Sequence, residues 1–284
     1  MTRDSLFRAA LARAGATDGG AASGGAAAAA APAGARGPAL GTWVKIPAME
    51  VVELVALAGF DFVVIDLEHS PMNLETAYQL IGTALHTGVA PIVRVPGRDQ
   101  GFIQRILDAG AEGIMVPHVD TPDQAREVVT AARFPPRGTR GVGSTSRAGQ
   151  WGAMPRAEYL RYGQEEVVVI AQIESAEGVR NAGSIAATDG IDALLVGAAD
   201  LSVSEGGGDV TDLVAEVVAE ARAAGVPVGN AGGATAEAVR YATETGFTFT
   251  LLSNDGTLLG TAARAAVTAG RSAGAESTTR SAHA

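Results

Sequence analysis

The sequence predicts an α/β protein in which a parallel sheet closes into a single (β/α)8 barrel, the TIM barrel architecture. Short β-branched runs alternate with longer segments of helical period, which is typical of repeated βα units. The length of 284 residues suits one barrel, which needs roughly 250 residues in a single core. Hydrophobic residues make up 47% of the chain and aromatic residues only 5%, so aliphatic side chains must fill the core. Such a composition is typical of a parallel sheet that is buried on both faces.

Eight segments have the composition of strands, and a helical segment follows each of them. The predicted strands are 41–46, 62–66, 91–95, 113–116, 167–173, 193–196, 227–230 and 248–252. The predicted helices are approximately 49–58, 74–87, 100–109, 122–132, 177–187, 211–224, 234–245 and 255–269. Glycine stands where several of these helices should end, as at Gly59 and Gly246, which is typical of helix C-caps.

An open doubly wound sheet would show the same periodicity, so the positions of unusual polar residues must discriminate between the two folds. In a barrel, active-site groups gather at the carboxyl ends of several strands. Here such groups follow the second, third, fifth and sixth predicted strands, and they are Asp66, Glu68, His69, Arg94, Gln172, Glu174 and Asp200. They would meet around one mouth, which favours the barrel.

The two ends of the chain differ from the barrel region, which spans residues 39–272. Residues 1–38 are expected to form a disordered Ala/Gly-rich leader, because most of it offers no large side chain to bury, although residues 5–14 could form a short helix. Residues 273–284 are small and polar and are expected to form a disordered tail. Neither a signal peptide nor an apolar run of about 20 residues is recognisable, so a cytoplasmic protein is expected.

Charge and cysteine content narrow the range of partners. The formal net charge is -10 and there is no run of Lys or Arg, which argues against nucleic acid or an anionic membrane as a partner. The expected partner is a small molecule or another copy of the chain. Because the chain contains no cysteine, a metal would have to bind through oxygen or imidazole groups.

Two carboxylates and an imidazole follow the second predicted strand, at Asp66, Glu68 and His69. Alternatively, the carboxylates only cap the following turn and His69 is a surface residue. Arg94 ends the third predicted strand, and a charge in that apolar setting needs an anionic partner or ligand. Alternatively, Arg94 simply pairs with Asp66 or Glu68.

Glu174 and Asp200 are the best candidates for metal ligands. Two carboxylates at adjacent strand ends describe an oxygen site that suits Mg²⁺ or Mn²⁺ and leaves coordination positions open for a substrate. Alternatively, Asp200 is only the N-cap of a helix over residues 201–205, and Glu174 is its ion-pair partner. Even then, the backbone N–H groups of Ala199 and Asp200 would point at the mouth, where an anion binds well.

Several motifs occur in order between about residues 40 and 268. They include Gly41-Thr42-Trp43-Val44-Lys45, Glu68-His69-Ser70-Pro71, Val93-Arg94-Val95-Pro96, Arg137-Gly138-Thr139-Arg140-Gly141, Gln172-Ile173-Glu174-Ser175 and Asp200-Leu201-Ser202. Together they resemble the motifs of the HpcH/HpaI class II pyruvate aldolases, and the combination is far more specific than any single motif. The resemblance implies a TIM barrel of the phosphoenolpyruvate/pyruvate type.

The resemblance also implies which residues bind the metal and the pyruvate. Glu174 and Asp200 match the two carboxylate ligands of a divalent ion, most simply Mg²⁺, with Mn²⁺ or Co²⁺ as alternatives. Arg94 matches the arginine that stabilises the enolate oxygen, and Gln172 matches the side chain that steadies pyruvate. Ala199 would contribute a backbone N–H group to the same substrate.

Two further positions match the proton-transfer residues of the family. His69 resembles the base and acid of the aldol step. Asp108, in Leu107-Asp108-Ala109-Gly110, matches the carboxylate that pairs with that imidazole, in some relatives from the neighbouring subunit. Such a partner fixes the imidazole tautomer and raises its pKa toward the working pH.

The activity implied is a class II aldolase that joins pyruvate to an aldehyde or cleaves a 2-keto-4-hydroxy acid. Lys45 is the only lysine of the chain, so a Schiff-base mechanism through it is the weaker rival. Two other functions stay open: a related lyase, decarboxylase or condensing enzyme on the same metal platform, and a non-catalytic barrel that binds a keto acid.

The resemblance implies a homohexamer as well, a dimer of trimers that exchange C-terminal helices. The apolar face of residues 255–267, with Leu258, Leu259, Ala262 and Ala266, is compatible with that exchange. The same face could equally pack on its own barrel.

Overall fold

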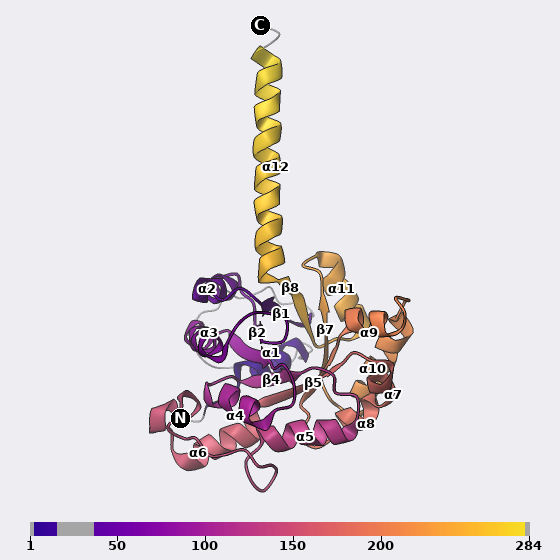
Figure 1. Ribbon diagram of the computed structural model, residues 1–284. Coiled ribbons are helices and arrows are strands. Elements are labelled where there is room, and N and C mark those ends of the chain that lie inside the picture. The colour runs from indigo at the N-terminus through magenta and orange to yellow at the C-terminus, as the bar shows by residue number, and fades with distance from the viewer. Residues whose placement is uncertain (1–2, 16–36, 282–284) are drawn as a thin grey trace.

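The computed structural model describes residues 3–15 and 37–281 of the chain. Eight parallel strands form a closed barrel in which each strand pairs with its neighbours in the sequence and β8 pairs with β1 (Figure 1). The strands are β1 (Ala39–Val44), β2 (Phe62–Asp66), β3 (Ala90–Arg94), β4 (Gly113–Val116), β5 (Val168–Ile173), β6 (Ala193–Val196), β7 (Val228–Gly232) and β8 (Phe249–Asn254). The predicted barrel is confirmed.

Helices follow the strands and cover the outside of the barrel. They are α2 (Met49–Leu57), α3 (Leu74–Thr87), α4 (Gln100–Asp108), α5 (Pro122–Ala132), α7 (Ala176–Arg180), α8 (Ala182–Ala186), α9 (Ala198–Ser204), α10 (Thr211–Ala223) and α11 (Ala236–Thr245). The single helix predicted over 177–187 is divided into α7 and α8. Between α5 and β5, three further short helices form where no element is predicted: η1 (Arg147–Gly152), α6 (Arg156–Arg161) and η2 (Tyr162–Glu166).

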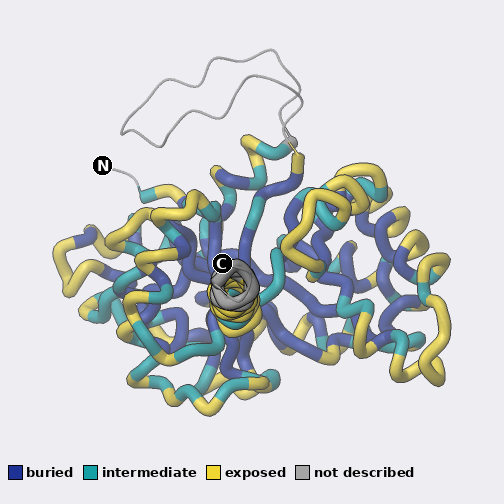
Figure 2. Tube along the Cα trace, turned by 90° about the horizontal axis from the view of Figure 1, so that it is seen from above, coloured by how far each residue is buried: buried dark blue, intermediate teal, exposed yellow. Residues whose placement is uncertain are grey.

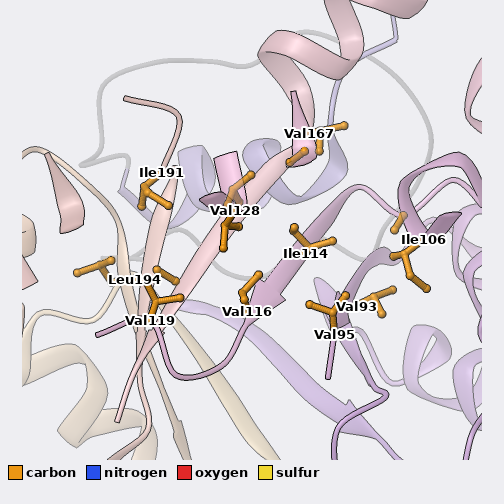
Figure 3. Close-up of a cluster of buried hydrophobic side chains, with 14 of the residues drawn as sticks. Val93, Val95, Ile106, Ile114, Val116, Val119, Val128, Val167, Ile191 and Leu194 are labelled. Atoms are coloured by element: carbon orange, nitrogen blue, oxygen red, sulfur yellow. The ribbon is translucent and has the colours of Figure 1, made fainter. Parts of the chain in front are cut away.

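Alternate residues of each strand face opposite sides of the barrel wall. In β4, Ile114 and Val116 pack outward in the cluster that includes Ile106 of α4 and Val128 of α5 (Figure 3). Met115, between them, packs in a second cluster inside the barrel. Both layers consist mainly of aliphatic side chains, as the composition predicts.

The amino-terminal helix α1 (Leu6–Gly15) closes the amino end of the barrel. Phe7 is fully buried, and its ring meets those of Phe62 and Phe249 edge-on, with ring centroids 5.0 and 5.6 Å apart. Phe62 begins β2 and Phe249 begins β8, so these contacts lie at the amino ends of the strands. The helix is therefore part of the barrel core.

Polar contacts hold the start of α1 in place. The Ser5 hydroxyl and the backbone N–H of Phe7 donate hydrogen bonds of 3.1 and 3.2 Å to the buried carboxylate of Glu112. Arg8 forms an ion pair of 2.6 Å with Asp192, which directly precedes β6. These contacts tie α1 to two different strands of the barrel.

The prediction that residues 1–38 are disordered is wrong for residues 3–15. The reason is Phe7, which supplies the large apolar side chain that the Ala/Gly-rich remainder lacks. Residues 1–2 and 16–36, on which the rest of that prediction falls, lie outside the described residues.

The carboxyl-terminal helix α12 (Asp255–Ser281) projects away from the barrel (Figure 1). Its first residue is anchored, because the backbone N–H groups of Lys45 and Ile46 donate to the Asp255 carboxylate at 2.9 and 2.8 Å. Figure 2 looks along α12, whose coloured part is drawn mostly as exposed, whereas buried residues concentrate in the barrel wall. The alternative in which this helix packs on its own barrel is therefore wrong.

The predicted disorder of residues 273–284 is also not observed as far as Ser281, because the backbone of α12 continues to that residue. Residues 282–284 lie outside the described part of the chain. Among the described helices, α12 included, none combines the length and apolar character required to cross a membrane.

Truncation of Phe7 tests the role of α1. Phe7→Ala should lower the free energy of unfolding by about 3 kcal/mol, because it removes a fully buried ring and leaves a cavity on the barrel floor. Arg13→Ala on the same helix, which removes only a solvent-exposed ion pair with Asp61, should change it by less than about 1 kcal/mol. Urea unfolding of both variants measures the difference, and equal effects would contradict the structural role of α1.

Candidate active site

The polar residues predicted at strand ends gather at the carboxyl end of the barrel. Asp66 ends β2 and Arg94 ends β3, and the two residues are paired in the strand register. Gln172 lies in β5 and Glu174 follows it, while Asp200 lies in α9 directly after β6. Because parallel strands place their carboxyl ends at one rim, residues from four units of the fold share one mouth.

A buried ion pair joins β2 and β3 at this rim. The Nε and Nη2 groups of Arg94 donate to the two oxygens of Asp66, at 2.9 and 2.6 Å. Arg94 Nη1 also lies 3.1 Å from Glu68 Oε2, and Lys45 Nζ lies 2.9 Å from Asp66 Oδ2. The alternative in which Arg94 pairs with Asp66 or Glu68 is therefore correct, since it contacts both.

The charge state of Asp66 follows from these contacts. Burial alone would raise its pKa, but the hydrogen bonds and charge of Arg94, together with the contact to Lys45, outweigh burial and lower the pKa of Asp66 to about 2. Asp66 is thus ionised at neutral pH. The Nζ atom of Lys45, which a Schiff base would require, contacts Asp66, and this contact argues against the rival mechanism.

The guanidinium of Arg94 also stacks on an aromatic ring. Its central carbon lies 4.2 Å from the ring centroid of Trp43, so the aromatic face stacks against it. An arginine has five N–H groups, and two of those of Arg94 donate to Asp66, while Nη1 lies near Glu68 without a hydrogen bond to it. Among the described residues, the other N–H groups have no acceptor, so they are available to a ligand. Trp43 was not among the predicted site residues. It stands two residues before Lys45, so the alternation of a strand places both side chains on the same side of the barrel wall, and this signal could have indicated Trp43.

Asp66 also shapes the turn that carries His69. The backbone N–H groups of Glu68 and His69 donate to Asp66 Oδ1 at 3.1 and 3.2 Å, so Asp66 caps this turn as the alternative interpretation supposed. The His69 side chain is 57% exposed, and its Nε2 lies 3.7 Å from Glu68 Oε2. His69 therefore stands on the outer part of the rim.

Glu174 is buried among donors. The Gln172 amide donates to Glu174 Oε2, and the backbone N–H of His118 donates to Oε1 at 2.7 Å. The His118 imidazole Nδ1 lies 2.9 Å from the same Oε1. Burial raises the pKa of Glu174, His118 opposes this effect, and the nearby charges of Glu68 and Asp200 reinforce it. His118 was not among the predicted site residues, although it stands two residues after β4, where the other site groups also stand after their strands.

The helix that carries Asp200 starts against Glu174. A Cβ on Gly197 would lie 2.9 Å from Glu174 Cβ and 3.0 Å from its Oε2, so a side chain at this position would displace the carboxylate. The helix α9 begins at Ala198, and Asp200 lies in its first turn. The alternative in which Asp200 caps a helix at 201–205 is therefore wrong. Ala199 lies in the same turn, where backbone N–H groups have no partner within the helix.

The donor set fits a hard divalent cation. Within residues 3–15 and 37–281 no three His, Asp or Glu side chains converge as a complete metal cage. Glu174 and Asp200 instead offer two carboxylates whose mutual repulsion a cation would relieve. The Oε1 atom of Gln172 is buried beside them without a hydrogen-bond partner, as expected where a ligand completes the site. A site with two protein ligands leaves positions for substrate oxygens.

Asp108 is the one predicted site residue that the chain does not bring to the rim. It ends α4, which runs back from the carboxyl end of β3 toward the amino end of β4. There it pairs with Arg140 at 2.8 Å and accepts a hydrogen bond of 3.3 Å from the Tyr159 hydroxyl. Within the described residues no contact joins Asp108 to His69, whereas the resemblance allows this carboxylate to come from the neighbouring subunit.

Comparison with known proteins agrees with this fold. The sequence pattern of the HpcH/HpaI aldolase/citrate lyase family matches residues 39–262. The hydroxypyruvate/pyruvate aldolase of Deinococcus radiodurans is 39% identical over 238 residues, which cover 82% of this chain and 85% of that protein.

Solved structures give the same picture. A HpcH/HpaI aldolase/citrate lyase family protein from Burkholderia cenocepacia J2315 is 38% identical with a TM-score of 0.77, covering 83% of this chain and 95% of that one. Macrophomate synthase is 28% identical with a TM-score of 0.68, covering 82% and 85%. The similarity to aldolases makes the protein a carbon–carbon lyase, as the sequence predicts. The chain belongs to the HpcH/HpaI aldolase/citrate lyase family.

Proposed function

We propose that the chain is a divalent-metal-dependent class II aldolase that forms or cleaves the bond between the methyl carbon of pyruvate and an aldehyde. The proposal is supported by two carboxylates whose charges interact, Glu174 and Asp200, on the same rim as the buried guanidinium of Arg94, which among the described residues donates only to Asp66. The name of the Deinococcus radiodurans relative supports pyruvate as one substrate.

Glu174 and Asp200 would hold the cation, with Mg²⁺ expected and Mn²⁺ or Co²⁺ as substitutes. When bound, such a cation supplies Lewis-acid polarisation of the substrate carboxylate and ketone oxygens. The backbone N–H groups of Ala199 and Asp200 would bind the pyruvate carboxylate, because they lie in the first turn of α9 and have no partner within that helix. Gln172, whose amide donates to Glu174, would steady pyruvate from the neighbouring strand.

Arg94 would stabilise the negative charge that develops on the ketone oxygen as the methyl group loses a proton. Asp66 and Trp43 already fix its orientation, so the guanidinium needs little rearrangement during the reaction. This preorganisation is what makes a buried donor effective in a transition state.

His69 would transfer the proton of the hydroxyl group that derives from the aldehyde. Its imidazole is exposed at the rim, where a second substrate would enter, and it contacts Glu68 rather than Glu174 or Asp200. In cleavage it accepts the hydroxyl proton, and in synthesis it returns the proton to the new alkoxide.

The active form would be a homohexamer, a dimer of trimers in which the carboxylate partner of His69 is the partner subunit's Asp108. Asp108 lies on the wall of an outer cavity of about 460 Å³, beside Arg147 and Trp151. The Trp151 ring is 66% exposed, so this surface offers a large apolar side chain to another subunit. Exchange of α12 between subunits would cover its exposed Leu259 and Val267.

A second candidate is a condensing enzyme or decarboxylase that uses the same rim. It is favoured by the structural similarity to macrophomate synthase. Product analysis separates the two: the aldolase requires pyruvate to be released from hydroxy-keto acids, whereas a decarboxylase acts on oxaloacetate alone.

Removing either carboxylate tests the metal site. Glu174→Gln and Asp200→Asn should each abolish Mn²⁺ binding in calorimetry and deuterium exchange into the pyruvate methyl group, because each removes one of only two charged ligands. Glu205→Gln, at the exposed end of α9, is the matched control and should retain both. Exchange at the wild-type rate in Glu174→Gln or Asp200→Asn would contradict the proposed site.

Subunit mixing tests the shared active site. His69→Ala and Asp108→Ala should each be weakly active, and mixed hexamers should regain activity at about one quarter of their sites, because random exchange pairs an intact His69 with an intact Asp108 in that fraction. Retro-aldol rates before and after mixing at equal ratio measure the recovery. A mixture that stays at the mean of the two single variants would show that Asp108 does not act across subunits.

A further inference from the structure

His118 has an unusual backbone conformation at the rim. Its φ is +53°, in the left-handed region that non-glycine residues rarely occupy, although His, Asn and Asp enter it more readily than others. Arg98 Nη1 donates to the His118 carbonyl at 3.3 Å and so holds this turn from outside. Energetically costly backbone conformations persist where the surrounding structure demands them, often at functional sites.

This conformation brings two nitrogen atoms of one residue close to one carboxylate oxygen. The backbone N–H of His118 lies 2.7 Å from Glu174 Oε1, and the imidazole Nδ1 lies 2.9 Å from the same oxygen. An ionised carboxylate only accepts hydrogen bonds, so the tautomer with its proton on Nδ1 is the one that suits this contact. The other ring nitrogen, Nε2, faces Glu68 Oε1 at 3.7 Å, and the side chain is 64% exposed to the mouth.

The two oxygens of Glu174 are therefore not equivalent. Oε1 accepts a hydrogen bond from the His118 backbone N–H, and the imidazole Nδ1 of the same residue lies 2.9 Å away. Oε2 accepts one from the Gln172 amide and keeps one lone pair. Oε2 also packs against Gly197, the residue from which α9 and Asp200 continue.

We propose that His118 is a positioning residue that fixes the rotation of the Glu174 carboxylate, so that Oε2 alone is presented to a divalent cation beside Asp200. The inference rests on the cation site of the proposed function and adds to it the group that orients its buried ligand. Without the imidazole, the carboxylate could rotate and turn either oxygen toward the cation. The ligand would then no longer be oriented before the cation binds.

Two substitutions separate the ring from the backbone. His118→Gly accepts the left-handed φ and keeps the backbone N–H, but it lacks the Nδ1 donor. His118→Asn also tolerates this φ, and its side-chain amide can place an N–H where Nδ1 stands. His86→Asn, on α3 and bonded only to the Gly82 carbonyl, is the matched control for loss of an imidazole.

The measurement is Mn²⁺ affinity by calorimetry without substrate, with the thermal unfolding midpoint recorded for each variant. We expect His118→Gly to weaken Mn²⁺ binding by about tenfold or more, and His118→Asn to stay within about threefold of the wild type. At saturating Mn²⁺, His118→Gly should recover most of its pyruvate proton exchange, because the role is orientation of a ligand.

Equal Mn²⁺ affinity of His118→Gly and the wild type would overturn the inference. So would a His118→Asn variant as weak as His118→Gly, since the Nδ1 donor would then not be the cause. These outcomes leave wild-type Mn²⁺ binding intact and are thus distinct from failure of the proposed function, in which the wild type itself binds no Mn²⁺.

Discussion

Eight strands that run in one direction around a closed barrel must all end at the same rim, and the chemistry of this protein depends on that constraint. Asp66, Arg94 and Gln172 come from three different strands, yet each lies at or next to the carboxyl end of its own strand. The register directly pairs Asp66 with Arg94, so that their bidentate contact also joins β2 to β3. The amino end of the same barrel is closed by Phe7 of α1, which leaves the carboxyl rim as the functional face.

The rim divides its charges into a satisfied group and an unsatisfied one. Asp66 is matched by Arg94 and Lys45, and this pairing explains both its low pKa and the fixed position of the guanidinium. In the part of the chain that the structure describes, no Arg or Lys pairs with Glu174 or Asp200; burial and the charges of Glu68 and Asp200 raise the pKa of Glu174. A divalent ion would supply positive charge beside these carboxylates. Their burial and repulsion destabilise the fold without the ion, and relief of that cost would contribute to the affinity for the ion.

The sequence predicts the barrel well because its signals are local and repeated. Short apolar runs mark the eight strands, and polar residues at or after the ends of several of them mark the rim. What it cannot predict depends on contacts between distant residues. In the sequence, Phe7 is one large apolar residue in a short segment with a weak helical pattern. Only the fold brings Phe62 and Phe249 into contact with it. His118 becomes a site residue only through a left-handed turn that faces Glu174 from another unit. Asp108 matches a family motif, but the direction of α4 carries it to the other end of the barrel.

The central claim is that the rim separates stabilisation of the ketone oxygen, by Arg94, from proton transfer at the aldehyde side, by His69. The most direct test measures pyruvate methyl deuterium exchange, retro-aldol cleavage and Mn²⁺ affinity in Arg94→Ala and His69→Ala. Arg94→Ala should slow both exchange and cleavage by a factor on the order of 10²–10³. His69→Ala should slow cleavage by roughly 10²–10⁴ with Mn²⁺ affinity unchanged. Loss of Mn²⁺ binding in His69→Ala, or wild-type exchange in Arg94→Ala, would contradict the account.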